Sequence, residues 1–351
     1  MLKKLVTSET GGGRQNNYDL MRVFAMSMVV LNHVADYYFN MYQNNGWIPS
    51  KTVYLFEGMS HFAVPLFLML TGAFVINKAG RCSAKDFYIS SLRKLGIPFL
   101  FFVIAYYIYD ICNERIFLEQ IWHIFYTGFI GVYAHWYIVM LAVIYAFIPL
   151  IAFVKKRVEY KQYERVCVII FIWLMFSHYF EDGQTTWCLT QLYFLGYVLM
   201  GDIISTKLRG KNNNLLGFVL IICAFIIVII NHYILYSVVL AGGAYYNKLL
   251  NLYGAPLIIT ASLVAFCGFS LLKIKRRFSL LASASYTVFL CHKLLLNIVD
   301  DHTDILDILD SILRMNLKII IPIECIALII VSIGVALLFN AMINKLIYKK
   351  G

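Results

Sequence analysis

The first long apolar segment of the chain contains four ionisable side chains, those of Asp19, Arg22, His33 and Asp36. A charge inside an apolar helix is costly unless it is paired or hydrated, so each residue is a candidate functional group. A histidine titrates near neutral pH and can act as a general base that takes a proton from a hydroxyl. A neutral histidine can also serve only as a hydrogen-bonding partner between helices. Two roles are therefore open for His33, proton transfer and helix packing.

The spacing within this segment groups its polar residues. Eleven positions separate Arg22 from His33, which is three helical turns plus about 20°, so both lie on one helix face about 16 Å apart. Asp19 and Arg22 are three positions apart and can form an ion pair. Asp36 follows His33 at the same spacing and is a candidate for orienting the imidazole. Asn32 is adjacent to His33 and is expected to point elsewhere on the helix.

The elements that must position these side chains are membrane helices. Of the 351 residues, 61% are hydrophobic and only 14% are charged, whereas soluble domains carry about 25% charged residues. The mean hydropathy is +0.74. A helix needs about 20 mostly apolar residues to span a bilayer. The chain contains ten such runs, which predicts an all-α transmembrane bundle of about ten helices: Tyr18–Tyr38, Met59–Asn77, Leu95–Cys112, His135–Val154, Val166–Phe180, Leu189–Ile204, Leu215–Leu235, Leu252–Leu272, Leu280–Ile298 and Ile319–Ile343. The fifth and sixth runs are the weakest.

The charges of the connecting segments predict the orientation. Alternate segments hold 23 of the 30 Lys and Arg residues: Met1–Asn17, Lys78–Lys94, Lys155–Arg165, Ser205–Asn214, Lys273–Phe278 and Asn344–Gly351. By the positive-inside rule these segments face the cytosol, so both chain ends are cytosolic. Arg22 then lies near the cytosolic interface, either as a snorkelling anchor or as a functional cation. His33 lies at or beyond the middle of the bilayer. The net charge of +11 is explained by this asymmetry, and no nucleic-acid partner is expected.

Several motifs for other chemistries are absent from the sequence. The eight cysteines form no C-x-x-C pair and no zinc-type spacing with histidines. There is no G-x-x-x-x-G-K-[ST] phosphate loop and no G-x-G-x-x-G turn. We therefore expect no metal cofactor and no ATP-driven transport within this chain.

Asp19-x-x-Arg22, followed by ten residues and His33, resembles the signature of the acyltransferase-3 family of membrane O-acyltransferases. Five further segments resemble the helices of that family in order: VPLFLMLTGAFVI with Thr71-Gly72, LRKLGIPFL, HWYIVMLAVIYAFIPLI with Trp136, Tyr145 and Pro149, QLYFLGYVLMG, and SYTVFLCHKLLL with His292. The chain departs from the family at Arg93-Lys94, where many members have R-x-x-R, and at Lys293, where proline is usual. The resemblance covers nearly the whole chain.

The resemblance implies a stand-alone acyltransferase domain over residues 18–345, with cytosolic tails at 1–17 and 346–351 and no fused second domain. It implies transfer of an acyl group, most often acetyl from acetyl-CoA, to a hydroxyl of a cell-surface or lipid-linked glycan. The implied location is the cell membrane, and the implied partners are acyl-CoA, the glycan and the bilayer.

The resemblance also suggests roles for residues along the first helix. Arg22, Arg93 and Lys94 are expected to hold the phosphates of acyl-CoA at a basic cytosolic mouth, although Arg93 and Lys94 can equally be plain interfacial anchors. The pantetheine arm is long enough to cover the about 16 Å to His33. There His33 either deprotonates the acceptor hydroxyl or itself accepts the acyl group.

His292, in the ninth run, is the second candidate for a polar site residue, with helix packing as the alternative. Asp19, Asp36 and Trp136 are assigned with it to substrate binding. Residues near the outer boundary that are candidates for an acceptor entrance, or else ordinary interfacial residues, are Glu57, His61, His123 and His135.

Two other classes of function remain compatible with the sequence. Buried charges also mark the pathways of transporters and flippases, and a membrane sensor or partner subunit is a third possibility. Only the enzyme requires His33 for turnover of a thioester.

Overall fold

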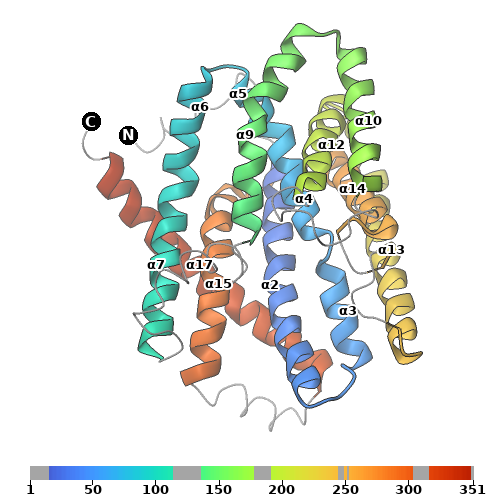
Figure 1. Cartoon of the computed structure of the whole chain (residues 1–351), viewed down its shortest axis with the longest axis vertical. Coiled ribbons are helices and arrows are strands. Elements are labelled where there is room, and N and C mark those ends of the chain that lie inside the picture. Colours follow the sequence, from blue (N-terminus) through green and yellow to red (C-terminus); the bar gives the residue numbers. More distant parts are fainter. Residues whose placement is uncertain are drawn as a thin grey trace.

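The computed structural model describes residues 16–113, 136–177, 191–243, 249–250, 253–302 and 316–348. Within these ranges every regular element is helical, as the sequence predicts, and no strand is present. Most of the helices run roughly along the long axis of the molecule (Figure 1).

The helices in chain order are α2 (Asn16–Asn44), α3 (Lys51–Ser60), α4 (Ala63–Thr71), the π-helical turn η1 (Gly72–Ile76), α5 (Asn77–Ala79), α6 (Ala84–Ser91), the π-helical turn η2 (Leu92–Gly96), α7 (Ile97–Cys112), α9 (Trp136–Arg157), α10 (Tyr160–Ser177), the 3₁₀ turn η5 (Gln191–Tyr193), α12 (Phe194–Lys207), α13 (Asn214–Leu240), α14 (Pro256–Leu271), α15 (Ser279–His302) and α17 (Leu317–Tyr348).

Each of the ten predicted runs overlaps one helix or one continuous series of helices. In the part of the chain that the structure describes, six stretches are long and apolar enough to cross a membrane: Lys51–Ala79, Ala84–Cys112, Tyr137–Arg157, Asn214–Leu240, Ser279–Asp301 and Leu317–Ile343. Helix α14 is apolar but shorter, and α2 has 29 residues but is interrupted by ionisable groups. Helices α10 and α12 correspond to the two weakest runs, and their spanning of the membrane remains a prediction.

The short connections between helices lie at opposite ends of the bundle. The α5–α6 and α9–α10 connections lie together at the upper end in Figure 1, whereas the α2–α3 connection lies at the lower end. The two upper connections belong to basic segments of the sequence, and the lower one does not. This arrangement agrees with the alternation of charge that the sequence analysis used.

Polar and apolar residues are distributed as in a membrane protein. Large apolar side chains such as Ile104, Trp173 and Ile222 are exposed on the outer faces of α7, α10 and α13, whereas Asp202 and His292 are completely buried. A soluble protein of this size rarely exposes so much contiguous apolar surface. The outer faces therefore suit lipid, and these two ionisable groups lie inside the bundle.

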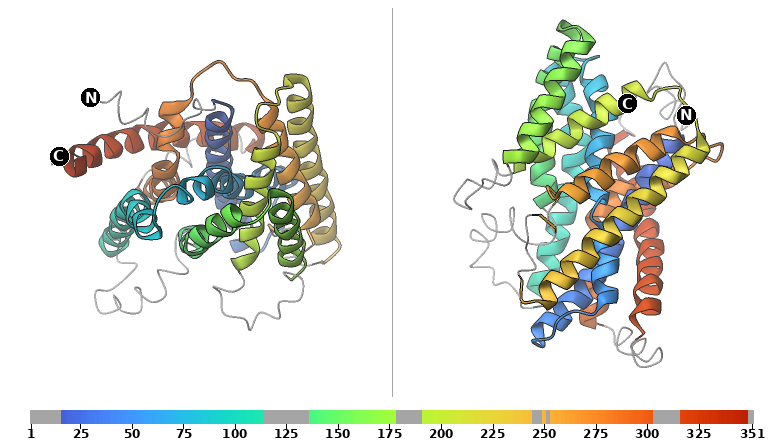
Figure 2. Two further views of the ribbon diagram at one scale, coloured as in Figure 1. Left: turned by 90° about the horizontal axis from the view of Figure 1, so that it is seen from above. Right: turned by 90° about the vertical axis from the view of Figure 1, so that its right-hand side faces the viewer.

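Helix α2 packs against α3, α4, α14, α15 and α17, and the view from above places it among the other helices (Figure 2). Its start is tied to the end of α14. The Asn17 amide donates hydrogen bonds of 3.2 Å to the carbonyls of Phe269 and Ser270, and the Asn16 amide donates to that of Ile274 at 3.1 Å. Carbonyls in the last turn of a helix have no intrahelical partner, so these amides satisfy them.

Two glycines allow α4 and α12 to cross in close contact. A Cβ atom at Gly72 would collide with the carbonyl oxygen of Val198, and one at Gly201 would collide with that of Met69. Small residues at such a crossing let helix backbones approach each other in a membrane. Both glycines belong to segments that carry the family resemblance.

Candidate functional site

Arg22 and Asp19 lie in the first third of α2. Its Nη1 atom is 3.5 Å from Asp19 Oδ1, which confirms the predicted pair, and its side chain is 31% exposed. The guanidinium lies 5.8 Å from the ring centre of Phe74, which belongs to the π-helical turn η1. A π-helical turn redirects the side chains around it and is frequent at functional sites. Here η1 places an aromatic ring beside the arginine.

His33 lies beside a carboxylate that Asn32 also contacts. Its Nδ1 atom lies 3.4 Å from Asp36 Oδ2, and the Asn32 amide donates a 2.9 Å hydrogen bond to the same carboxylate oxygen. Asn32, which was expected to point elsewhere on the helix, thus shares Asp36 with His33, because Asp36 is four positions from Asn32 and three from His33 and can reach both. Ser60 of α3 in turn donates to Asn32 Oδ1 at 2.5 Å. This cross-helix contact could not be found from spacing within one helix.

His292 of α15 lies beside His33, with ring centres 5.0 Å apart. It is completely buried, and its Nδ1 atom is 2.9 Å from the Val288 carbonyl. A carbonyl only accepts hydrogen bonds, so we assign the proton to Nδ1 and leave Nε2 as an acceptor. Within the described residues, Nε2 has no hydrogen-bond partner. The structure thus brings together the two histidines that the sequence proposed separately.

Lys293 also faces this site. It follows His292 on α15, is half-buried and interacts electrostatically with Asp36. The sequence analysis noted it only as a departure from the family pattern. Its position inside an apolar run was the signal that could have marked it as a site residue.

A group of tyrosines lies near the arginine end of the site. Tyr145 of α9 interacts electrostatically with Arg22, and Tyr137 and Tyr286 interact with Tyr145. The Tyr286 hydroxyl donates a 2.9 Å hydrogen bond to the Leu95 carbonyl in η2. The sequence analysis matched Tyr145 to a family segment but gave no role to any of these tyrosines.

The remaining predicted site residues that the structure describes lie outside the group formed by Arg22, His33, Asp36 and His292. Arg93 and Lys94 are exposed in the π-helical turn η2, at the start of α7. Trp136 begins α9, but its side chain lies outside the described part, as do His123 and His135. Glu57 and His61 are buried in α3 and at its end, respectively.

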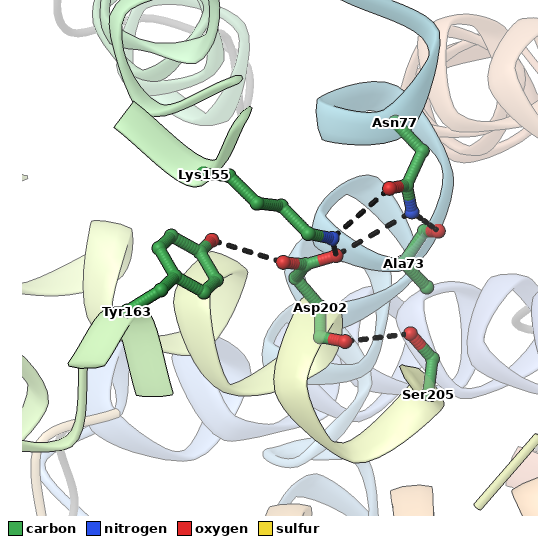
Figure 3. A network of polar contacts seen from close by, with 6 residues as sticks. All are labelled: Ala73, Asn77, Lys155, Tyr163, Asp202 and Ser205. Atoms are coloured by element: carbon green, nitrogen blue, oxygen red, sulfur yellow. Dashed lines mark hydrogen bonds and ion pairs between the residues drawn. The ribbon is translucent and has the colours of Figure 1, made fainter. Parts of the chain in front are cut away.

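A buried network that the sequence analysis missed joins α5, α9, α10 and α12 (Figure 3). Asp202, which is completely buried, accepts hydrogen bonds from Lys155 at 2.6 Å, Tyr163 at 2.9 Å and Asn77 at 3.4 Å. Asn77 also donates to the Ala73 carbonyl within η1 at 3.2 Å. The network therefore holds the turn that carries Phe74. An acidic residue inside the sixth apolar run was the available signal for it.

The described residues contain no group of three or more His, Cys, Asp or Glu side chains placed to hold a metal ion. The site that remains is made of two adjacent histidines, a carboxylate fixed by an amide, and an arginine paired with a second carboxylate on the same helix.

Comparison with known proteins assigns the chain to a family. A family model described as an acyltransferase domain, that of the acyltransferase-3 family, matches residues 15–341, nearly the whole chain. Comparisons with curated proteins and with solved structures gave no match. The matched range includes every helix that contributes to the site. The chain therefore belongs to the acyltransferase-3 family and is a membrane acyltransferase.

Proposed function

We propose that this enzyme moves an acetyl group from cytosolic acetyl-CoA to a hydroxyl of a cell-surface or lipid-linked glycan in the plasma membrane. The observation that carries the proposal is the placement of His33 between the His292 ring and the Asp36 carboxylate. The same helix carries Arg22 eleven positions earlier. A base and a cation for the donor are thus on one rigid element.

The donor enters from the cytosolic side in this proposal. The basic segments 78–94 and 155–165 support that orientation by the positive-inside rule. Arg22 binds a CoA phosphate with the planar fork of its guanidinium, and Asp19 fixes the position of that fork. Arg93 and Lys94, exposed in η2, bind the remaining phosphates. The pantetheine arm then carries the thioester the about 16 Å to His33.

Asp36 determines which imidazole nitrogen reacts. Because it lies next to Nδ1 of His33, it favours the tautomer with Nδ1 protonated and leaves Nε2 as the base. Nε2 takes the proton of the acceptor hydroxyl, the hydroxyl oxygen bonds to the carbonyl carbon, and the carbon–sulfur bond breaks. The proton passes to the CoA sulfur. In the second route Nε2 bonds to the acyl carbon first, while the carbon–sulfur bond breaks and CoA leaves as the thiolate. The acceptor hydroxyl oxygen then bonds to the acyl carbon and displaces Nε2, and the hydroxyl proton passes to the thiolate.

The acceptor is placed by groups around His33. The Nε2 atom of His292, buried and without a partner among the described residues, accepts a hydrogen bond from the acceptor. Asp36 contacts it from α2, and Trp136 contributes from the start of α9.

The test uses purified protein, labelled acetyl-CoA and candidate sugars, with release of free CoA and transfer of label as readouts. His33→Ala removes the base and should lower kcat by about 10²–10⁴-fold. His33→Gln, which keeps the bulk and polarity of the side chain, should be equally inactive while unfolding at the wild-type temperature. Full acyl transfer by His33→Ala would show the mechanism to be wrong. Movement of a glycan across sealed vesicles without any acyl chemistry would instead favour a transporter.

A further inference from the structure

A second pair of histidines lies where α3 packs against α13. The ring centres of His61 and His232 are 4.8 Å apart, and the residues are 9% and 1% exposed. Gly58 makes this contact possible, because a Cβ atom there would collide with the His232 ring. The backbone of α3 therefore passes directly beside the imidazole.

In both imidazoles the Nδ1 atom lies next to a backbone carbonyl of the same helix. Nδ1 of His61 is 3.1 Å from the Glu57 carbonyl, and Nδ1 of His232 is 3.1 Å from the Val228 carbonyl. Each Nδ1 is thus assigned the proton, and each Nε2 is an acceptor. Among the described residues, Nε2 of His232 and Oδ1 of the adjacent Asn231 are buried without a hydrogen-bond partner. Buried acceptors without donors are costly, so they mark a place where a donor is expected to bind.

This second pair is connected to the reactive site. Ser60, adjacent to His61, bonds to Asn32, which holds Asp36. The Tyr253 ring lies 5.8 Å from that of His61 and interacts electrostatically with Asp36. Asp36 thus interacts with residues that lie near both histidine pairs, and its side chain is 32% exposed.

The charges around these residues decide which ligand the site suits. Asp36 and Glu57 both act on Tyr253, and the cation Lys293 acts on Asp36. Two carboxylates disfavour an anionic ligand. Neutral imidazole and amide acceptors match the hydroxyls of an uncharged sugar, and the Tyr253 ring offers an aromatic face on which a sugar ring can pack.

We propose that Asn231, His232 and His61 bind the uncharged hydroxyl groups of the glycan acceptor and hold it beside Asp36 and His33. This inference rests on the proposed function and adds the location and chemical class of the acceptor site. The acceptor hydroxyl that reacts lies at His33, and the neighbouring hydroxyls donate to His232 Nε2 and Asn231 Oδ1.

Binding of sugars tests the site separately from catalysis. Methyl β-glucoside, methyl β-galactoside and N-acetylglucosamine are titrated into the purified full-length protein, with glucuronate as the anionic comparison, and thermal unfolding is followed. At least one neutral sugar should stabilise the wild type. His232→Leu and Asn231→Leu should each raise the apparent Kd of that sugar about tenfold, the loss expected for one buried hydrogen bond, while acetyl-CoA stabilises both variants as it does the wild type.

A glycine pair controls for general damage to the fold. Gly58→Ala displaces the His232 ring and should weaken sugar binding, whereas Gly334→Ala, where an added Cβ meets nothing within 4 Å, should not. The inference is overturned if no neutral sugar binds the wild type, if glucuronate binds as well as the neutral sugars, or if the leucine variants bind sugar like the wild type. Failure of the proposed function would be detected by a different experiment, in which the His33→Ala variant retains acyl transfer.

Discussion

The Asp36 carboxylate is central to the site, because groups from two helices interact with it. His33 and Asn32 reach it along α2, and Lys293 faces it from α15. Asn32 is itself fixed by Ser60 of α3. Under the proposed mechanism, a carboxylate held in this way orients the imidazole and stabilises the imidazolium that forms when His33 takes a proton. In that mechanism Ser60 of α3 influences the base without touching it.

Removing the Ser60 hydroxyl should therefore affect catalysis indirectly. Ser60→Ala frees Asn32 Oδ1, loosens Asp36 and should lower kcat by about tenfold, with the KM for acetyl-CoA unchanged. Steady-state kinetics measure both parameters.

The control for this variant is Ser27, a serine of α2. Among the described residues, the Ser27 hydroxyl bonds only to the Val23 carbonyl of its own helix, at 3.1 Å, so Ser27→Ala should keep wild-type kinetics. Equal losses in the two variants would mean that Ser60 has no specific link to His33.

At the scale of elements, the crossing of α4 and α12 leaves no room for a side chain. Gly201→Leu inserts bulk against the Met69 backbone, and overpacking of this kind costs about 1–3 kcal/mol or more. We expect a lower unfolding temperature in detergent and reduced activity. Gly334→Leu should be tolerated, because the space around that glycine is open. A Gly201→Leu protein as stable as the wild type would contradict the close crossing.

For the network around Asp202 we expect a loss of stability, because it contains a buried ion pair. Asp202→Asn leaves Lys155, 18% exposed, without its counter-charge and should cost about 3 kcal/mol of unfolding free energy. Asp202→Leu combined with Lys155→Met removes both charges and should restore much of that loss. Denaturant unfolding in mild detergent measures the difference.

The exposed pair of Lys207 and Glu164 is the matched comparison, with Lys207 50% exposed. Lys207→Met should change stability by less than about 1 kcal/mol, as is usual for surface pairs. If Lys155→Met alone proved as harmless as Lys207→Met, the network would not hold these helices together.

These elements also show how far the sequence alone could lead. Long apolar runs determine helices, so all ten runs overlap helices, and the Asp19–Arg22 pair follows from spacing within one helix. The π-helical turns η1 and η2 could not be predicted, because they depend on packing between helices rather than on local propensity. The contacts of Ser60 with Asn32 and of His292 with His33 likewise join helices far apart in the sequence, whose relative rotation no periodicity specifies.

At the scale of the whole molecule, orientation across the bilayer determines which side supplies the donor. Reporter fusions at Asn214 and Arg277, both within basic segments, should report the cytosol, and a fusion at Asn45, in the α2–α3 connection, should report the outside. A reversed pattern would place Arg22 at the outer surface and exclude cytosolic acyl-CoA as its ligand.

The continuity of α2 has a consequence for the choice of donor. The helix is unbroken from Asn16 to Asn44, and its first turn is fastened to the end of α14, so it can neither shorten nor slide. The helix therefore keeps Arg22 and His33 at a fixed distance of about 16 Å. Under the proposed function, a thioester reacts only when its carrier has an anionic group and a tether of matching length. The enzyme then selects its donor by the carrier and not by the acyl chain. A short thioester without such a tether is a poor donor, whichever acyl group it carries.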